Sequence, residues 1–516
     1  MAITEAAERA VLYKAIDYVY KDPDNNIPKM MNTINKVLPD NVFPVQRARF
    51  TEVIGDKDNN WYRLIRKLFD LNPEVSNKLI KIIIDGTLFA WSEQEKNRDK
   101  YECNIPWAIL LDPTSACNLK CIGCWAAEYG HQQNLTYDEI DSIINQGVAL
   151  GTKIYIYTGG EPLVRKKDII KLCEAHQDCA FLAFTNGTLI DDEFCQEMVR
   201  VGNFVPAISA EGTESTTDAR RGEGVYNKIE HAMALLRQYK LPFGISTCWT
   251  KDNVDAVASE ANYDWMVDEG ALFCWFFHYM PVGRSSGKEL LPTPEQRVKM
   301  YNCTRSMRKT KSIFTLDFQN DGEFVGGCIA GGRRYLHINA AGDVEPCVFI
   351  HYSGANIRDM SLLDCLRQPL FMQYYDNMPF NDNYLRPCPM LENPDRLPAM
   401  VAASGAHSTD LVEPESPDQL REKTKDYAEA WAPVADQIWF GDDDQWAPPK
   451  RKGKRTQGMA DSDIHRFEKQ GRTLKPYLDD SEINDSSDAD KYNMESSELK
   501  KAEEDAALTG DIRDDE

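Results

Sequence analysis

The chain has 516 residues, of which 42% are hydrophobic and 27% are charged, an ordinary composition for a soluble protein of two or three domains. Its net charge of −23 disfavours nucleic acid as a partner, because an acidic surface repels phosphate backbones. The first residues lack the order of a signal peptide, and no apolar run is long enough to cross a membrane. We therefore expect a cytoplasmic protein whose 14 cysteines are core residues, metal ligands or redox groups.

Residues 1–105 are predicted to form a helical region, because apolar residues recur near helical spacing in 11–21 and 77–91. Within it, residues 61–91 mix basic, aromatic and apolar side chains. Two interpretations fit that mixture: a helical cap packed on the rest of the protein, or a peripheral contact with a membrane surface.

Residues 106–316 alternate short apolar strands with amphipathic helices. Thr136 and Glu139 form a capping box at the start of the first of these helices. Six strands, each followed by a helix, predict parallel pairing in an α/β fold, a partial (β/α)6 barrel with its site at the carboxyl ends of the strands. The expected strands are 107–112, 153–158, 180–185, 204–209, 242–247 and 272–281.

Residues 317–396 are predicted to be a small α+β extension, with a β-hairpin over 335–349 and a helix over 361–375. From 397 to 516 the composition becomes charged and polar, and we expect a largely disordered acidic tail with one helix near 426–439.

Three cysteines, Cys117, Cys121 and Cys124, lie in a polar loop directly after the first strand. Three thiolates can hold three irons of a [4Fe–4S] cluster and leave the fourth iron open to a chelating ligand. A zinc site would need a fourth protein ligand, and no second cysteine or histidine pair lies nearby to supply it. Three buried core cysteines are the remaining alternative.

The C-x3-C-x2-C spacing after a first strand resembles the radical S-adenosylmethionine (SAM) superfamily, and further motifs follow in that family's order. The resemblance spans residues 105–394 and implies that a SAM-binding [4Fe–4S] cluster splits SAM reductively to a 5′-deoxyadenosyl radical, which abstracts hydrogen from a substrate. It also implies a low-potential electron donor of the flavodoxin or ferredoxin type. The residues it assigns to SAM binding are Gly159, Gly160, Glu161, Pro162, Thr185, Asn186, Ser209, Glu211 and Arg221.

One position departs from the family pattern. An aromatic residue commonly precedes the third cysteine and lies near the adenine, whereas this chain has Gly123 there. Trp125, directly after the third cysteine, is a candidate substitute.

A second set of cysteines, Cys328, Cys347 and Cys388, lies in the extension, which resembles the SPASM/Twitch domains of many radical SAM enzymes. The resemblance implies one auxiliary [4Fe–4S] cluster, and the alternative is an extension without metal. Cys365 lies in a predicted amphipathic helix and is expected to be a core residue rather than a fourth ligand.

The other cysteines are scattered on strand and helix patterns and are expected to fill the core, as is the aromatic strand 272–281. His278 is expected to be a packed residue, whereas Arg284 is a candidate contact for SAM or substrate. The seven cysteines that are expected to fill the core are Cys103, Cys173, Cys179, Cys195, Cys248, Cys274 and Cys303.

Three functions remain open on the sequence. The extension favours an enzyme that modifies a peptide or protein, since many relatives with such an extension do so. The same chemistry on a lipid or another small apolar molecule is the second possibility, and a non-catalytic iron–sulfur electron carrier is the third.

Overall fold

The computed structural model describes residues 5–37, 44–283 and 286–440. The chain divides into two compact units, residues 1–59 with 436–516, and residues 60–435. In the first unit three helices follow one another, as the sequence predicts for this region. They are α1 (Glu5–Val19), α2 (Pro23–Val37) and α3 (Pro44–Gly55).

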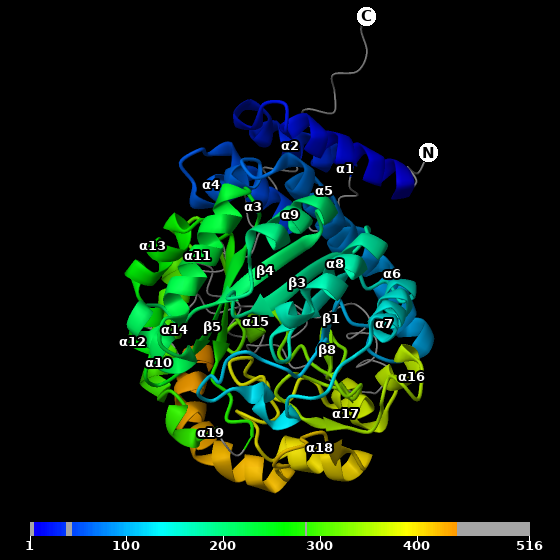
Figure 1. The fold of residues 1–516 in the computed structure, drawn as a ribbon, viewed down its shortest axis with the longest axis vertical. Helices are drawn as coiled ribbons and strands as arrows, with labels where there is room; N and C mark the ends of the chain where they lie inside the picture. The colour runs from blue at the N-terminus through cyan, green and yellow to red at the C-terminus, as the bar shows by residue number, and fades with distance from the viewer. Residues whose placement is uncertain (1–4, 38–43, 284–285, 441–516) are drawn as a thin grey trace, which may run out of the picture. The chain divides into compact units, whose positions relative to one another are not determined.

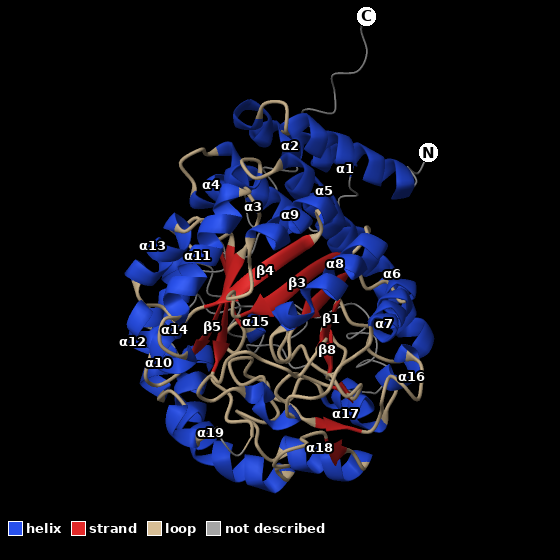
Figure 2. Cartoon of the chain, viewed as in Figure 1, coloured by secondary structure: helices blue, strands red, loops and turns tan. Residues whose placement is uncertain are grey.

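The second unit is built on one nine-stranded sheet with the order β7-β6-β5-β4-β3-β2-β1-β8-β9 (Figures 1 and 2). Every pairing from β7 to β8 is parallel, and only the β8–β9 hairpin is antiparallel. The strands are β1 (Ala108–Leu111), β2 (Ile154–Tyr157), β3 (Ala180–Thr185), β4 (Phe204–Ser209), β5 (Gly244–Trp249), β6 (Phe273–His278), β7 (Phe314–Asp317), β8 (Tyr335–Ile338) and β9 (Val344–Glu345).

Helices connect the successive strands, and several of them, including α7, α9 and α10, begin at a side-chain cap. Thr136 and Glu139 form the expected capping box at the start of α7. The connecting helices are α7 (Tyr137–Ala149), α8 (Lys166–Ala175), α9 (Asp192–Val201), α10 (Glu214–Arg221), α11 (Val225–Gln238), α12 (Val254–Val257), α13 (Glu260–Asp268), α14 (Pro294–Met307) and α15 (Gly322–Val325). The expected parallel α/β sheet is confirmed.

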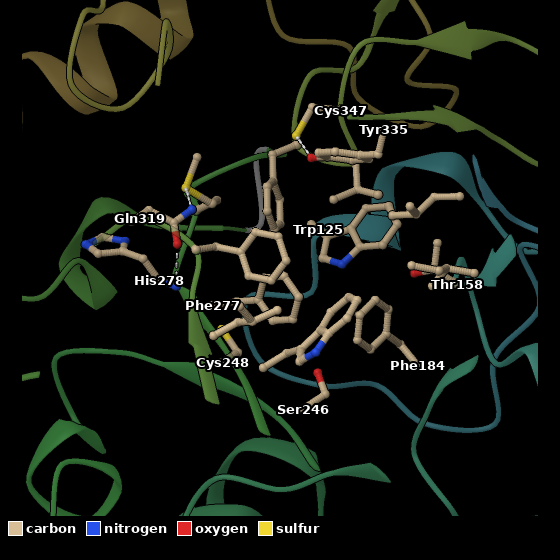
Figure 3. Close-up of a pocket in the computed structure, with 18 of the residues that line it drawn as sticks. Trp125, Thr158, Phe184, Ser246, Cys248, Phe277, His278, Gln319, Tyr335 and Cys347 are labelled. Atoms are coloured by element: carbon tan, nitrogen blue, oxygen red, sulfur yellow. Dashed lines mark hydrogen bonds between the residues drawn. The ribbon is translucent and has the colours of Figure 1, made fainter. Parts of the chain in front are cut away.

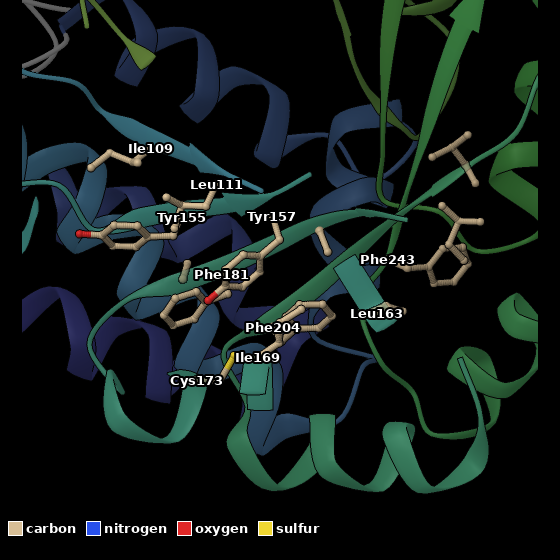
Figure 4. Packing of buried hydrophobic residues seen from close by; sticks show 14 of the residues in the cluster. Ile109, Leu111, Tyr155, Tyr157, Leu163, Ile169, Cys173, Phe181, Phe204 and Phe243 are labelled. Carbon is tan, nitrogen blue, oxygen red and sulfur yellow. The ribbon is translucent and has the colours of Figure 1, made fainter. Parts of the chain in front are cut away.

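The two faces of the sheet carry different side chains. Odd-numbered residues of β1 and β2, such as Ile109 and Tyr155, lie in the main hydrophobic core beneath the helices (Figure 4). Even-numbered residues, such as Leu110 and Ile156, belong to a second cluster on the opposite, concave face. Because side chains alternate along a strand, the continuous apolar runs in the sequence supply both faces at once.

The segment 61–91 forms α4 (Asn60–Leu68), α5 (Pro73–Ile84) and a π-helical turn (Asp85–Phe89) that leads into α6 (Ala90–Tyr101). Val75, Leu79 and Ile82 lie in the main core of the sheet, so the segment is used as a helical cap. None of the described helices is long and apolar enough to cross a membrane.

The extension differs from the sequence expectation in three respects. The predicted hairpin is present as β8–β9, but β8 pairs with β1 and so extends the main sheet. The helix predicted over 361–375 is divided into α16 (Leu362–Leu366) and α17 (Pro369–Asn377), because Pro369 cannot continue a helix and starts a new one.

The boundary expected at 397 is wrong, because residues 397–440 lie largely in helices. α18 (Arg396–Ser404) and α19 (Pro417–Phe440) follow one another, with the short pair β10 (Tyr352–Ser353) and β11 (His407–Ser408) beside them. Trp431 of α19 is fully buried and stacks under the guanidinium of Arg297 at 4.2 Å. Because α19 also carries charged residues on its other side, its composition did not indicate that one face is buried. The rest of the predicted tail, 441–516, lies outside the described residues.

Candidate functional site

A chamber of about 790 Å³ lies on the concave face of the sheet. It is lined by Tyr335 at one edge of the parallel strands and Leu316 at the other, so the sheet curves around it (Figure 3). Both predicted cysteine sets line this one chamber: Cys117, Cys121, Cys124, Cys328, Cys347 and Cys388.

The loop of the first cysteine set is held by the backbone of the glycine pair that follows β2. Gly160 N donates to Thr114 O at 3.1 Å, and Glu161 N donates to Ala116 O at 2.8 Å. A Cβ added to Gly160 would lie 2.2 Å from the carbonyl oxygen of Ala116. Only glycine therefore allows the two loops to approach this closely.

Glu161 joins three loops with its side chain. Its carboxylate, which is fully buried, accepts hydrogen bonds from Leu163 N at 2.9 Å, Thr185 Oγ1 at 2.7 Å and Asn186 N at 2.8 Å. Asn186 Nδ2 in turn donates to Asn118 Oδ1 in the cysteine loop at 2.8 Å. The expected SAM-binding residues Gly159, Gly160, Glu161, Thr185 and Asn186 therefore form one braced rim that faces the chamber.

Two of the expected SAM-binding residues do not line the chamber. Pro162 is buried at the start of a short 3₁₀ helix (Pro162–Arg165). Glu211, also buried, accepts from Arg221 Nε at 2.5 Å and from Arg220 Nη1 at 2.9 Å. Although burial raises the pKa of Glu211, its two arginine partners hold it below its ordinary value. Glu211 is thus a positioning residue for the arginines.

The arginines themselves face the cysteine loop. Arg221 and Arg220 line the chamber beside Ser209, and Arg221 Nη1 lies 4.0 Å from Cys121 Sγ. Two guanidinium groups and one carboxylate leave one net positive charge at this place. That charge favours thiolates in the loop or an anionic ligand beside it.

The position of the missing aromatic residue is filled from another strand. Gly123 has φ +65°, and a Cβ there would lie 2.6 Å from Cε2 of Tyr279, which follows β6. Trp125, the expected substitute, also lines the chamber but packs edge-on to the His337 ring at 5.7 Å. Tyr279, rather than Trp125, occupies the space beside residue 123.

The second cysteine set comes from three segments: Cys328 precedes β8, Cys347 follows β9, and Cys388 follows α17. Tyr335 Oη and Cys347 Sγ are 2.7 Å apart, and Cys388 Sγ accepts from Met390 N and Leu391 N at 3.4 Å each. Burial raises the pKa of Cys347 to about 11 and that of Cys328 to about 12. These thiols therefore need a cationic partner, such as a metal, to ionise at neutral pH.

Cys365 does not join this set. It is fully buried in the main core on α16, next to Leu362 and Leu366, and it does not line the chamber. In the described part of the chain, no three His, Cys, Asp or Glu side chains are placed to share a single metal ion.

Sequence reasoning missed Cys248, which was expected in the core but lines the chamber on β5 (Figure 3). Burial raises the pKa of its thiol, and the nearby Arg220 opposes that effect. The available signal was strand alternation, because Ser246, two residues earlier, points to the same face. Cys303 on α14 is half-buried, and the other scattered cysteines, Cys103, Cys173, Cys179, Cys195 and Cys274, are buried as expected.

Aromatic rings form much of the chamber wall. Phe184 packs against Trp275 at 5.1 Å and Phe277 at 5.4 Å, and Phe277 stacks on Phe318 at 4.6 Å. The strand 272–281 was expected to be core, but its alternate residues Trp275 and Phe277 face the chamber. His278, which follows Phe277, also lines the chamber but is buried, and its Nε2 lies 2.8 Å from Tyr427 Oη. The candidate Arg284 lies outside the described residues.

A buried charged network lies behind Trp125. His337 Nε2 donates to Asp112 Oδ1 at 2.8 Å, and its Nδ1 donates to Glu345 Oε2 at 2.6 Å. Tyr129 Oη donates to the same oxygen of Glu345 at 2.7 Å. Although burial opposes protonation, the two carboxylates raise the pKa of His337 to about 10. The network ties the end of β1 and the segment after Cys124 to the β8–β9 hairpin.

Comparison with known proteins gives the family. Residues 111–260 match the model of the radical SAM superfamily. An AdoMet-dependent heme synthase of Methanosarcina barkeri is 25% identical over 50% of this chain and 80% of that protein. A PqqA peptide cyclase of Bradyrhizobium diazoefficiens is 26% identical over 49% of this chain and 70% of that protein.

Among solved structures, Streptococcus suis SuiB bound to S-adenosylmethionine is similar with a TM-score of 0.45 and 17% identity, over 52% of this chain and 67% of that one. The matched residues contain β2–β5, the end of β1 and the first cysteine loop, and the relatives named above are enzymes. The chain is therefore an enzyme with a radical SAM domain at residues 111–260, and members of that superfamily bind a [4Fe–4S] cluster and SAM.

Proposed function

We propose that this enzyme binds its SAM-cleaving [4Fe–4S] cluster through Cys117, Cys121 and Cys124 and abstracts hydrogen from an apolar substrate held in the chamber. When bound, the cluster supplies one electron to split SAM into methionine and a carbon radical. The chain's own contribution is to orient the cofactors and to keep water away from the reaction.

The residues around the first cysteine set fit such a group. Hydrogen bonds from Gly160 N and Glu161 N hold the backbone of this loop, and its three thiols line the chamber. The positive charge left by Arg220, Arg221 and Glu211 offsets the negative charge of thiolates. Arg221 is the residue whose guanidinium we assign to the carboxylate of SAM, with Glu211 holding it in place.

The chamber wall is the observation that favours an apolar substrate. Trp107, Phe184, Trp275, Phe277 and Phe318 present ring faces that gain by covering apolar surface, about 25 cal/mol per Å². A peptide backbone placed against these rings would leave amide groups without partners, at roughly 1–3 kcal/mol each. A lipid chain or a flat apolar molecule carries no such penalty.

A peptide or protein substrate is the second candidate, and one relative favours it. The PqqA peptide cyclase shares 26% identity with this chain across 70% of its own length. In this reading a single apolar side chain of the peptide enters the chamber, while its backbone stays outside.

We also assign an auxiliary [4Fe–4S] cluster to Cys328, Cys347 and Cys388, as expected for a SPASM/Twitch-like extension. Both proposed clusters would then border the same chamber, because both cysteine sets line it. We also propose an external low-potential donor of the flavodoxin or ferredoxin type, because each cleavage of SAM consumes one electron. Membrane contact by residues 61–91 stays a prediction.

The test uses anaerobically reconstituted enzyme with SAM and dithionite. Formation of 5′-deoxyadenosine is expected, with its loss in the variant that changes Cys117, Cys121 and Cys124 to alanine and retention in the control Cys365→Ala. Product formation by the triple variant would refute the assignment. Absence of product from the unaltered enzyme would favour the electron carrier.

The substrate class is decided by isotope transfer. Lipid and peptide fractions from cells grown in D₂O are supplied separately, and deuterium in 5′-deoxyadenosine is measured by mass spectrometry. We expect transfer from the lipid fraction. Transfer from the peptide fraction alone would refute the apolar-molecule assignment and support the second candidate.

A further inference from the structure

The second cysteine set is accompanied by two tyrosines. Tyr335, on the first position of β8, lines the chamber and has its hydroxyl 2.7 Å from the sulfur of Cys347. Either atom can donate while the thiol is neutral, but an ionised sulfur can only accept, so the tyrosine is then the donor.

The second tyrosine, Tyr374 of α17, is fully buried. Its hydroxyl has no hydrogen-bond partner among the described residues. A buried hydroxyl without a partner is destabilising and calls for an explanation, and an acceptor that binds beside it is one such explanation.

The surroundings of Tyr374 indicate which acceptor this is. Its ring packs on the segment that carries Cys328, since a Cβ at Gly331 would lie 2.5 Å from Tyr374 Cβ and Cγ. Burial raises the pKa of Tyr374, and the thiols of Cys328, Cys347 and Cys388 raise it further. The three sulfurs are therefore near enough for their charge, once they ionise, to act on this hydroxyl.

We propose that Tyr335 and Tyr374 donate hydrogen bonds to the sulfurs of the auxiliary centre and raise its reduction potential. The inference rests on the proposed auxiliary cluster at Cys328, Cys347 and Cys388. Donors to sulfur stabilise the reduced, more negative state of an iron–sulfur centre, because that state has more charge on its sulfurs. The first set differs in this respect. The donors described near its thiols are Leu119 N, 3.4 Å from Cys117 Sγ, and the more distant Arg221 Nη1, 4.0 Å from Cys121 Sγ, and neither is a tyrosine hydroxyl.

The test is a redox titration of the fully loaded protein followed by electron paramagnetic resonance. Tyr335→Phe and Tyr374→Phe each remove one hydroxyl and keep the ring. Because each hydroxyl would bond more strongly to the reduced centre than to the oxidised one, each change should shift the reduction equilibrium of the second centre about tenfold, or 59 mV, towards lower potential. The double variant should shift further, and the first centre should keep its potential.

The matched control is Tyr263→Phe, the same change at a fully buried tyrosine whose hydroxyl bonds to Thr304 Oγ1 at 3.3 Å. It should move neither potential. A second centre that is present but keeps its potential in both tyrosine variants would overturn the inference while leaving the proposed function intact. Protein that binds only the first cluster would overturn it as well. Loss of 5′-deoxyadenosine formation in unaltered enzyme would instead count against the proposed function.

Discussion

Because His337 is hydrogen-bonded to two buried carboxylates, the stability of this protein should fall with rising pH. The imidazole lies between Asp112 and Glu345, both fully buried, and these partners raise its pKa to about 10 from an ordinary value of 6.5. Above pH 6.5 the unfolded chain releases this proton while the folded chain keeps it. The extra stability is therefore complete below pH 6.5 and is lost as the pH rises through about 10.

The magnitude follows from the shift. The displacement from 6.5 to about 10 corresponds to roughly 4–5 kcal/mol at about 1.4 kcal/mol per pH unit. This is a large part of the roughly 5–15 kcal/mol by which a folded protein is stable. Between pH 7 and 9 the free energy of unfolding should fall by roughly 1.4 kcal/mol per pH unit through this one group.

The assay is urea unfolding followed by circular dichroism under anaerobic conditions, at pH 6, 7, 8 and 9. His337→Gln should be destabilised by roughly 3–5 kcal/mol at pH 6, because it leaves two buried carboxylates without their cation. It should also lose most of the pH dependence. The control Lys299→Ala removes the exposed ion pair with Asp255 and should cost less than about 1 kcal/mol. Equal pH slopes for the unaltered protein and His337→Gln would refute the reasoning.

Two further predictions concern the first cysteine loop. Gly160→Ala should abolish loading of the first cluster, since its Cβ would meet Ala116 O at 2.2 Å, whereas Gly354→Ala, at an exposed glycine, should load normally. Iron and sulfide content of the reconstituted proteins checks this, and normal content in Gly160→Ala would contradict it. Tyr279→Ala should weaken SAM binding at least tenfold by isothermal calorimetry, because it removes the ring beside Gly123, while Tyr279→Phe should bind normally. Unchanged affinity in Tyr279→Ala would contradict that role.

The sequence alone determined the order of the strands along the chain and the place of the first cysteine set. Apolar runs of four to six residues, each followed by a helix, leave few alternatives to a parallel sheet. Cys117, Cys121 and Cys124 follow the first of these strands, so the topology places them at its carboxyl end. These inferences depend on neighbours in the chain, and local periodicity contains that information.

The tertiary structure decided which distant residues share the chamber. Cys248 and Trp275 resemble core residues in sequence, because a strand buried on both faces shows no polar alternation. The pairing of β8 with β1, and with it the meeting of the two cysteine sets, joins residues more than 200 positions apart. Glu211 holds the arginines, Tyr279 fills the space at Gly123, and His337 lies between two carboxylates for the same reason. Each of these contacts joins two segments, and the local sequence of one segment does not predict its contact with the other.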